Sequence, residues 1–230
     1  MSNILFIDCE STCLKPKRLG NPKNLKCINE HKWRMVSIGY CVYTPTGQRI
    51  KENYFIINCP FYIPPKSTEI HGINNKKSLD EGIDIKDVFR YIEKDVNEHT
   101  VGILVSHNIK FDRTLLLSEI YRIGDLKLYS LLNKLQSFCT SRGFSDWRGW
   151  QRGYCELEQA YGYLFSTPLL GHHHALEDAK DCADVYFAIK NYTYEEYDII
   201  KNEFQVASAL ANLKIDFKVL EILNLQDAKK

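Results

Sequence analysis

The hydrophobic positions of this chain change their spacing along its length. Apolar runs at 3–9, 35–43 and 50–58 are typical of β-strands, and the turn sequence TPTGQR predicts that the second and third form a hairpin. Apolar residues recur every three or four positions over about 84–97, which predicts a helix. The uninterrupted run VGILVS at 101–106 predicts a buried strand. The first half of the chain therefore combines antiparallel strands with a helical crossover.

The second half of the chain is mostly helical in pattern. Strands joined by helical crossovers predict an α/β fold built on a mixed sheet. The prolines of residues 60–68 are expected to keep that stretch from being regular for long. We expect one domain over 1–190 and a C-terminal helical extension over 191–230 that packs on it. The remaining predicted elements are helices at 112–122, 155–162 and 175–190 and a short strand near 136–140.

Composition narrows the classes of function. The 230 residues are 44% hydrophobic and 26% charged, which is typical of a globular protein, and the net charge of +1 excludes a polybasic mode of nucleic-acid binding for the whole chain. No apolar run is long enough for a membrane span or a signal-peptide core. The eight cysteines form no CxxC pair, which favours free thiols. We expect a protein of a reducing intracellular compartment, the cytoplasm or nucleus, that is not secreted.

Two acidic residues end the first predicted strand. Side chains alternate between the faces of a strand, so Asp8 and Glu10 share a face with Ile4 and Phe6. Like charges placed side by side are unfavourable unless a cation lies between them, and divalent metals take carboxylate oxygens. The pair is therefore interpreted either as metal ligands or as two solvated acids where the strand frays.

A second candidate site is SHNIKFD at 106–112, directly after the buried strand. Asp112 begins the predicted helix, where a carboxylate is either a functional group or an ordinary N-cap. His107 and Asn108 lie on the tight connection, where their side chains are expected to bind backbone or substrate.

The third candidate is GHHHALEDAKDCADVY at 171–186. Asp178 flanks the apolar stripe of the predicted helix and is expected to point toward the end of the sheet. Three consecutive histidines cannot all reach one ion. His174 lies four residues before Asp178 and shares a helical face with it if the helix begins early. The residues alone leave open which of His172, His173 and His174 acts.

The segments FIDCE, SHNIKFD and HHALEDA, in this order and at these distances, resemble the three exonuclease motifs of the DEDDh family of 3′→5′ exonucleases. The resemblance covers about residues 3–190, and EIHGI at 69–73 and LEQAYGYLF at 157–165 fit it as well. It implies a ribonuclease-H-like fold, with a mixed five-stranded sheet flanked by helices.

The resemblance also implies a site and a reaction. The metal-binding acids are Asp8, Glu10, Asp112 and Asp178, and the general base is His173. Two magnesium or manganese ions assist hydrolysis of single-stranded or 3′-tailed DNA or RNA to 5′-mononucleotides. The alternatives are a proofreading subunit that depends on a polymerase and a nucleic-acid-binding module without activity. The resemblance further implies that Ser11, Thr12 and His71 contact substrate. Asn108 is also expected to contact substrate, because of its place on the tight connection.

Two local features lie outside the common motif pattern. A basic excursion at 13–34 leaves the predicted active-site edge, and Lys15, Lys17 and Arg18 in it are interpreted either as a guide for the phosphate backbone or as a solvated loop. Residues 141–154 interleave arginines with aromatic residues. Within them we expect Arg148 to contact substrate and Trp150 to pack as a cap.

Overall fold

The computed structural model describes residues 2–13, 33–150, 153–169, 173–197, 199 and 202. The chain divides into two compact units, residues 1–188 and 189–230, and the architecture that follows is that of the first. The predicted packing of residues 191–230 falls almost entirely outside the described residues and stays a prediction. Within the part of the chain that the structure describes, no helix is long and apolar enough to cross a membrane.

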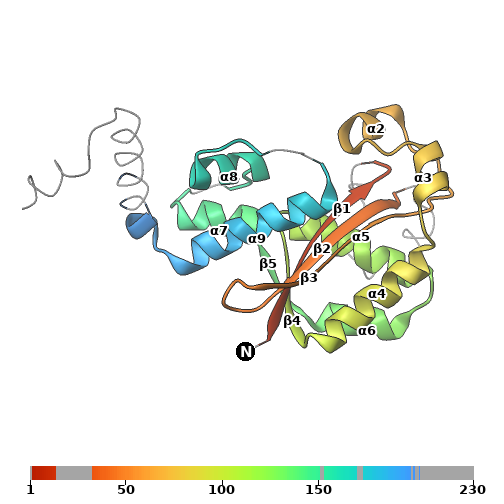
Figure 1. Cartoon of the computed structure of the whole chain (residues 1–230), viewed down its shortest axis with the longest axis horizontal. Coiled ribbons are helices and arrows are strands. Elements are labelled where there is room, and N and C mark those ends of the chain that lie inside the picture. Colours follow the sequence, from red (N-terminus) through yellow and green to blue (C-terminus); the bar gives the residue numbers. More distant parts are fainter. Residues whose placement is uncertain are drawn as a thin grey trace, which may run out of the picture. The chain divides into compact units, whose positions relative to one another are not determined.

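A mixed five-stranded sheet forms the centre of the first unit (Figure 1), as predicted. Its strand order is β3-β2-β1-β4-β5. β1 pairs antiparallel with β2 and parallel with β4, β2 and β3 form the predicted antiparallel hairpin, and β5 adds a second parallel pair at the edge. β4 is half-buried at Gly102 and Ile103 and buried elsewhere. The strands are β1 (Asn3–Ser11), β2 (Met35–Tyr43), β3 (Arg49–Ile56), β4 (Val101–Ser106) and β5 (Gln136–Cys139).

The sequence pattern did not predict four of the described helices, namely α2, α3, α6 and α7. The first begins at Pro65, in a first-turn position where proline costs no hydrogen bond, so the irregular stretch expected over 60–68 ends four residues early. The other three are short, at seven to nine residues each, which leaves too few repeats for a clear period. The helices are α2 (Pro65–His71), α3 (Asn75–Glu81), α4 (Ile85–Glu98), α5 (Ile109–Arg122), α6 (Leu126–Lys134), α7 (Thr140–Trp147), α8 (Leu157–Phe165) and α9 (Ala175–Asn191).

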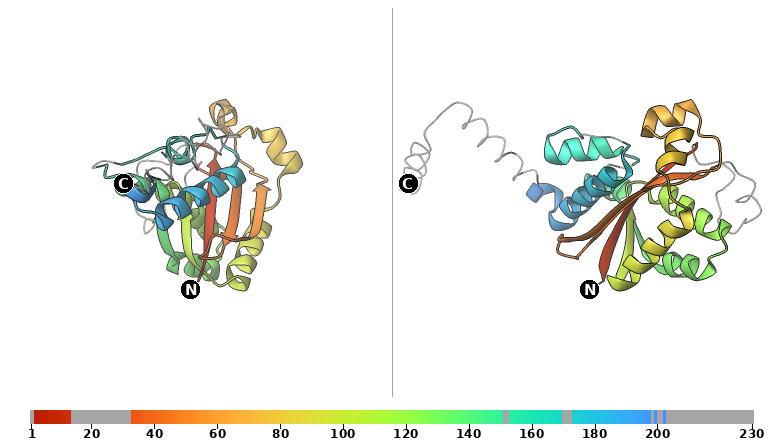
Figure 2. Two further views of the ribbon diagram at one scale, coloured as in Figure 1. Left: turned by 60° about the vertical axis from the view of Figure 1, so that its left-hand side comes forward. Right: turned by 45° about the vertical axis from the view of Figure 1, so that its right-hand side comes forward.

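The two faces of the sheet carry different layers of helices (Figures 1 and 2). Leu5, Ile7 and Cys9 of β1 pack in the larger core with α4, α5 and α6. Ile4 and Phe6 point the other way and pack against α9. This alternation confirms the facing predicted for β1, and it places Asp8 and Glu10 on the α9 side of the sheet.

Gly39 of β2 allows the start of α9 to approach the sheet closely. A Cβ atom at Gly39 would lie 2.1 Å from the backbone nitrogen of Leu176. Gly39 is also the partner of Asp8 in the β1–β2 register. A side chain there would push the first turn of α9 away from the β1 acids, so this glycine determines how close the two elements come.

All seven described cysteines are free thiols, and Cys9, Cys41, Cys59, Cys155 and Cys182 are buried. Small thiols pack as apolar groups in the interior. The compartment expected from the cysteine pattern stays a prediction.

Candidate active site

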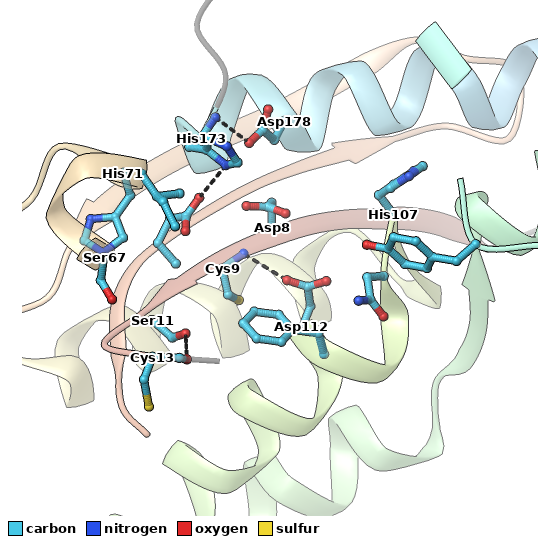
Figure 3. A pocket seen from close by; sticks show the side chains of 15 residues that line it. Asp8, Cys9, Ser11, Cys13, Ser67, His71, His107, Asp112, His173 and Asp178 are labelled. Atoms are coloured by element: carbon cyan, nitrogen blue, oxygen red, sulfur yellow. Dashed lines mark hydrogen bonds and ion pairs between the residues drawn. The ribbon is translucent and has the colours of Figure 1, made fainter. Parts of the chain in front are cut away.

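The four predicted acids and His173 line one pocket of about 360 Å³ at the end of β1 (Figure 3). They come from β1, from the first turn of α5 and from the start of α9, which are far apart in sequence. Parallel β1 and β4 end at the same edge of the sheet, and α5 follows β4 directly, so the fold brings these segments together.

Asp8 and Glu10 lie within the sheet and not on a fraying strand end. In the β1–β2 ladder Asp8 is opposite Gly39 and Glu10 is opposite Ser37. The pKa of Asp8 lies well above its usual range, because of burial first and of the neighbouring carboxylates second. Burial also raises the pKa of Glu10 to about 8, with further contributions from Asp178 and Asp112. The alternative of two solvated acids is therefore wrong.

Asp112 lies in the first turn of α5 and is not its N-cap. The helix begins at Ile109, three residues earlier than predicted, and Asn108 occupies the cap position. The buried carboxylate of Asp112 accepts hydrogen bonds from the Cys9 amide (3.0 Å) and the Ser106 hydroxyl (2.8 Å). Burial raises its pKa to about 7, although both hydrogen bonds act in the opposite direction. The bond to Cys9 ties Asp112 to the strand residue beside Asp8.

His173 and Asp178 approach from α9. The backbone amide of His173 donates to the Asp178 carboxylate (3.1 Å), and the His173 Nδ1 lies 4.0 Å from a carboxylate oxygen of Glu10. His173 has a φ of 63°, a left-handed conformation that histidine adopts more readily than most residues. Its side chain is half exposed, so a solvent-accessible imidazole is held beside two of the four acids, Glu10 and Asp178.

His174 lies elsewhere. Its ring packs on Tyr54 at 4.2 Å between centroids, and it does not line the pocket. His172 falls outside the described residues. Of the two described histidines of the triplet, the structure brings only His173 to the acids.

The pocket suits divalent cations. Among the described residues that line it there is no lysine or arginine, although four carboxylates meet there. Ligand atoms of Glu10, His173 and Asp178 lie within 4.8 Å of one another. Close carboxylates with raised pKa values are relieved by a bound cation, and oxygen-rich sites favour magnesium, manganese or calcium.

The residues implied to contact substrate fall into two groups. Ser11, His71 and Asn108 line the pocket. Thr12 does not: it is buried, and its hydroxyl accepts a hydrogen bond from the Arg34 amide (3.0 Å), which closes the base of the basic excursion. Within the described chain, the buried Nε2 of His71 has no hydrogen-bond partner. Such an atom is available to a ligand.

Arg148, which was also expected to contact substrate, does not line the pocket. The guanidinium of Arg148 lies over the ring of Tyr163 at 3.7 Å and near that of Trp150 at 5.0 Å, so it packs among aromatic rings. Trp150 packs edge-on against Phe144, as expected for a cap. Lys15, Lys17 and Arg18 fall outside the described residues.

Sequence reasoning missed several residues that line the pocket. Most carry no chemical signal on their own, because an apolar or small residue becomes a pocket wall only through the fold. Tyr154 and His107 were singled out by the sequence, Tyr154 in the stretch of interleaved aromatic and arginine residues and His107 on the tight connection. The missed residues are Cys9, Cys13, Ser67, Ile70 and Phe111.

Comparison with known structures agrees with this architecture. A complex of Escherichia coli exonuclease I with single-stranded DNA in its zinc-bound form has a TM-score of 0.64 at 14% identity, covering 88% of this chain and 43% of that one. The nuclease domain of 3′hExo, a DEDDh family member bound to rAMP, has a TM-score of 0.57 at 14% identity, covering 82% and 90%. Exonuclease X in complex with 5′-overhanging duplex DNA has a TM-score of 0.51 at 20% identity, covering 86% and 97%. At these identities the likeness shows the fold, and the chain spans less than half the length of exonuclease I.

No curated protein sequence matches this chain. The chain does match the exonuclease family RNase_T over residues 5–186, a span that holds all four acids and His173. The match confirms the resemblance to the DEDDh exonucleases and the prediction of an enzyme. This chain belongs to the RNase_T exonuclease family.

Proposed function

We propose that this protein is a metal-dependent 3′→5′ exonuclease that hydrolyses single-stranded nucleic acid ends to 5′-mononucleotides. The observation that carries the proposal is the pocket in which Asp8, Glu10, Asp112 and Asp178 meet beside the accessible imidazole of His173. The proposed substrates are DNA or RNA, because no described feature distinguishes the two sugars.

Each residue has a role in this proposal. The four carboxylates would hold two magnesium or manganese ions, which supply charge neutralisation at the phosphate and activation of a water molecule. The Cys9 amide and Ser106 hydroxyl fix the Asp112 carboxylate, and the His173 amide fixes that of Asp178. The His173 imidazole would accept the proton of the attacking water, since it is a solvent-accessible imidazole next to Glu10 and Asp178.

The pocket also argues for a strand end as the substrate. Its volume of about 360 Å³ lies at the low end of the range for small-molecule sites, roughly 300–1,000 Å³. A single terminal nucleotide is a better fit to such a volume than a duplex. The alternative of a binding module without activity is disfavoured, since four acids without a bound cation would repel a polyanion.

The decisive experiment uses 5′-labelled single-stranded DNA and RNA oligomers of matched sequence with magnesium, manganese or EDTA. We expect the oligomers to be shortened from their 3′ end into a ladder of products, and only when metal is present. The rates on DNA and on RNA then give the preference for one sugar. His173→Gln should abolish the ladder, whereas the adjacent His174→Gln, whose ring lies on Tyr54, should retain it.

Three results would reject parts of the proposal. Absence of cleavage by the folded wild type with metal would reject the enzyme as a stand-alone nuclease and favour a partner-dependent subunit. Loss of cleavage in His174→Gln with retention in His173→Gln would reassign the base. Shortening from the 5′ end would reject the polarity.

A further inference from the structure

Tyr154 is an exposed aromatic residue of the active-site pocket that the proposed reaction does not use. It lies on the segment 153–156 between α7 and α8 and lines the pocket together with Asn108 and Asp112. The residue is 65% exposed. An aromatic ring left open to solvent at a pocket wall is a candidate contact for a ligand.

The backbone that carries Tyr154 is held firmly on its C-terminal side. The Cys155 amide donates to the Ser141 hydroxyl (2.9 Å), and the Cys155 carbonyl accepts from the same hydroxyl (2.8 Å). The carbonyl also meets the His107 Nε2 at 2.6 Å. Both backbone groups of the residue next to Tyr154 are thus fixed by buried side chains.

The hydrogen-bond pattern assigns the state of His107. A carbonyl only accepts, so Nε2 carries the hydrogen, and Nδ1 then accepts from the Thr140 hydroxyl at 2.9 Å. Burial lowers the pKa of His107 to about 4, so the ring is neutral at physiological pH. The bond between His107 and Cys155 therefore does not depend on a charge that titrates near pH 7.

The N-terminal side of the segment is fixed by packing. A Cβ atom at Gly153 would lie 2.1 Å from the Cβ of Ser145 in α7, so the backbone passes directly against that helix. The Tyr154 ring itself lies edge-on to the His107 ring at 6.4 Å between centroids, and both Tyr154 and Asn108 line the pocket. A ring fixed in this way offers contact area at a low cost in conformational entropy.

The chemistry of the pocket indicates what such a ring would contact. The acids occupy the region around Asp8, and His71 and His107 lie toward opposite sides of it (Figure 3). Phosphates of a substrate are expected near the acids through bound cations. The bases need an apolar surface, and a tyrosine ring stacks on any base irrespective of sequence.

We propose that Tyr154 stacks on a nucleobase of the single strand near its 3′ end and that His107 is a positioning residue that holds it there through Cys155. The inference rests on the proposed function, because it takes the substrate to be a single strand of nucleic acid. It adds a substrate-binding residue that lies outside the three exonuclease motifs.

The test compares Tyr154→Ala and Tyr154→Phe with wild type on oligothymidylate and on oligomers with an abasic residue at the first, second or third position from the 3′ end. Tyr154→Ala should raise KM on the complete oligomer by roughly 10- to 100-fold, the loss expected for one stacked base. This increase in KM should vanish on the oligomer whose abasic residue replaces the stacked base. Tyr154→Phe, which keeps the ring, should stay within a few-fold of wild type.

Two variants serve as references. Tyr91→Ala removes another exposed tyrosine, on α4 and outside the pocket lining, and should leave KM unchanged on every oligomer. His107→Gln should raise KM on the complete oligomer, and on the abasic oligomer its KM should equal that of wild type. A merely structural role would lower the melting temperature without this dependence on a base.

The outcomes separate this inference from the proposed function. A KM penalty of Tyr154→Ala that is absent, or equal on complete and abasic oligomers, overturns the stacking role while the nuclease stands. The dissociation constants of the same oligomers, measured with calcium in place of magnesium, report stacking without turnover. If wild type never cleaves but these constants show the base-dependent penalty, the stacking role stands and the proposed reaction falls.

Discussion

Asp112 and Glu119 are two buried carboxylates seven residues apart on the same helix, α5, and their surroundings are opposite. Glu119 accepts from the Arg34 guanidinium at 2.8 and 3.1 Å and from the Met35 amide at 3.0 Å. It also forms an ion pair with Arg122 at 2.8 Å. The chain itself supplies the positive charge that this carboxylate needs.

Asp112 receives only neutral donors, from Cys9 and Ser106, and its charged neighbours are other acids. Burial therefore raises its pKa to about 7. The contrast shows how a fold distinguishes a structural acid from a ligand-binding acid. A buried carboxylate with its own cations is complete, whereas one among other carboxylates is stabilised only by a proton or by a cation from outside.

The largest effect should come from removing the compensated acid. Glu119→Ala leaves two arginines in a largely buried site without their carboxylate, and we expect a loss of about 3–5 kcal/mol in the free energy of unfolding. Chemical denaturation measures it. Asp80→Ala removes an acid whose partner Lys76 is exposed and should cost less than about 1 kcal/mol. Equal losses in the free energy of unfolding for both variants would mean that the buried ion pairs of Glu119 contribute no more than an exposed one.

Metal binding should stabilise the protein through Asp112 and not through Glu119. With magnesium or manganese at about 100 times its dissociation constant, the free energy of unfolding of wild type should rise by about 2.7 kcal/mol. Thermal unfolding with and without EDTA detects the change. Asp112→Asn should lose most of this increment, and Glu119→Gln, though less stable, should keep it. If metal stabilises Asp112→Asn as much as wild type, the proposed difference between Asp112 and Glu119 is wrong.

The acids of the pocket should destabilise the metal-free protein as pH rises. The pKa of Glu10 is about 8 in the folded protein, above its ordinary value near 4.5, so its stabilising contribution is complete below pH 4.5 and is lost as pH rises toward 8. In EDTA at pH 6, about 1.5 units above the ordinary pKa, Glu10→Gln should therefore exceed wild type by roughly 2 kcal/mol, and by more at pH 8. The advantage should disappear below about pH 4. Equal unfolding curves at pH 8 would contradict the raised pKa.

The smallest effect should come from changing geometry at constant charge. Arg34 binds Glu119 through two nitrogens, and a lysine would keep one of these contacts. Arg34→Lys should cost about 1 kcal/mol in urea denaturation. Arg90→Lys, at an exposed pair with Asp87, should be neutral within error. No loss in Arg34→Lys would indicate that charge alone is sufficient at Glu119.

Much of the site could be predicted because it depends on patterns within short segments of the sequence. Strand alternation placed Asp8 and Glu10 on one face, and the motif order predicted that Asp112 and Asp178 belong with them. The start of α5 was missed by three residues, because Ile109 and Phe111 belong to the turn that the motif occupies and add no clear helical period. The residues alone left the choice among the histidines open and the family resemblance implied His173, but no sequence pattern reveals the left-handed φ of that residue.

Other parts could not be predicted, because they depend on contacts between distant segments. Arg34 belongs to the basic excursion in sequence, yet it pairs with Glu119, 85 positions away. Arg148 appeared suited to phosphate, but the aromatic rings of Trp150 and Tyr163 pack around it. Thr12 follows the pocket residue Ser11 in the sequence, but its hydroxyl accepts a hydrogen bond from the Arg34 amide at the base of the basic excursion. In each case a polar residue serves the fold where its type alone favoured the substrate.

The contact between Gly39 and the start of α9 has a consequence for biosynthesis. Asp8 precedes Asp178 by 170 residues in the sequence, so the fourth carboxylate is synthesised long after the first, with α9 near the end of the unit. A nascent chain that stops before Asp178 therefore lacks a complete set of acids, even with the sheet formed. Under the proposed function, a partly synthesised chain would therefore lack nuclease activity until α9 has been added.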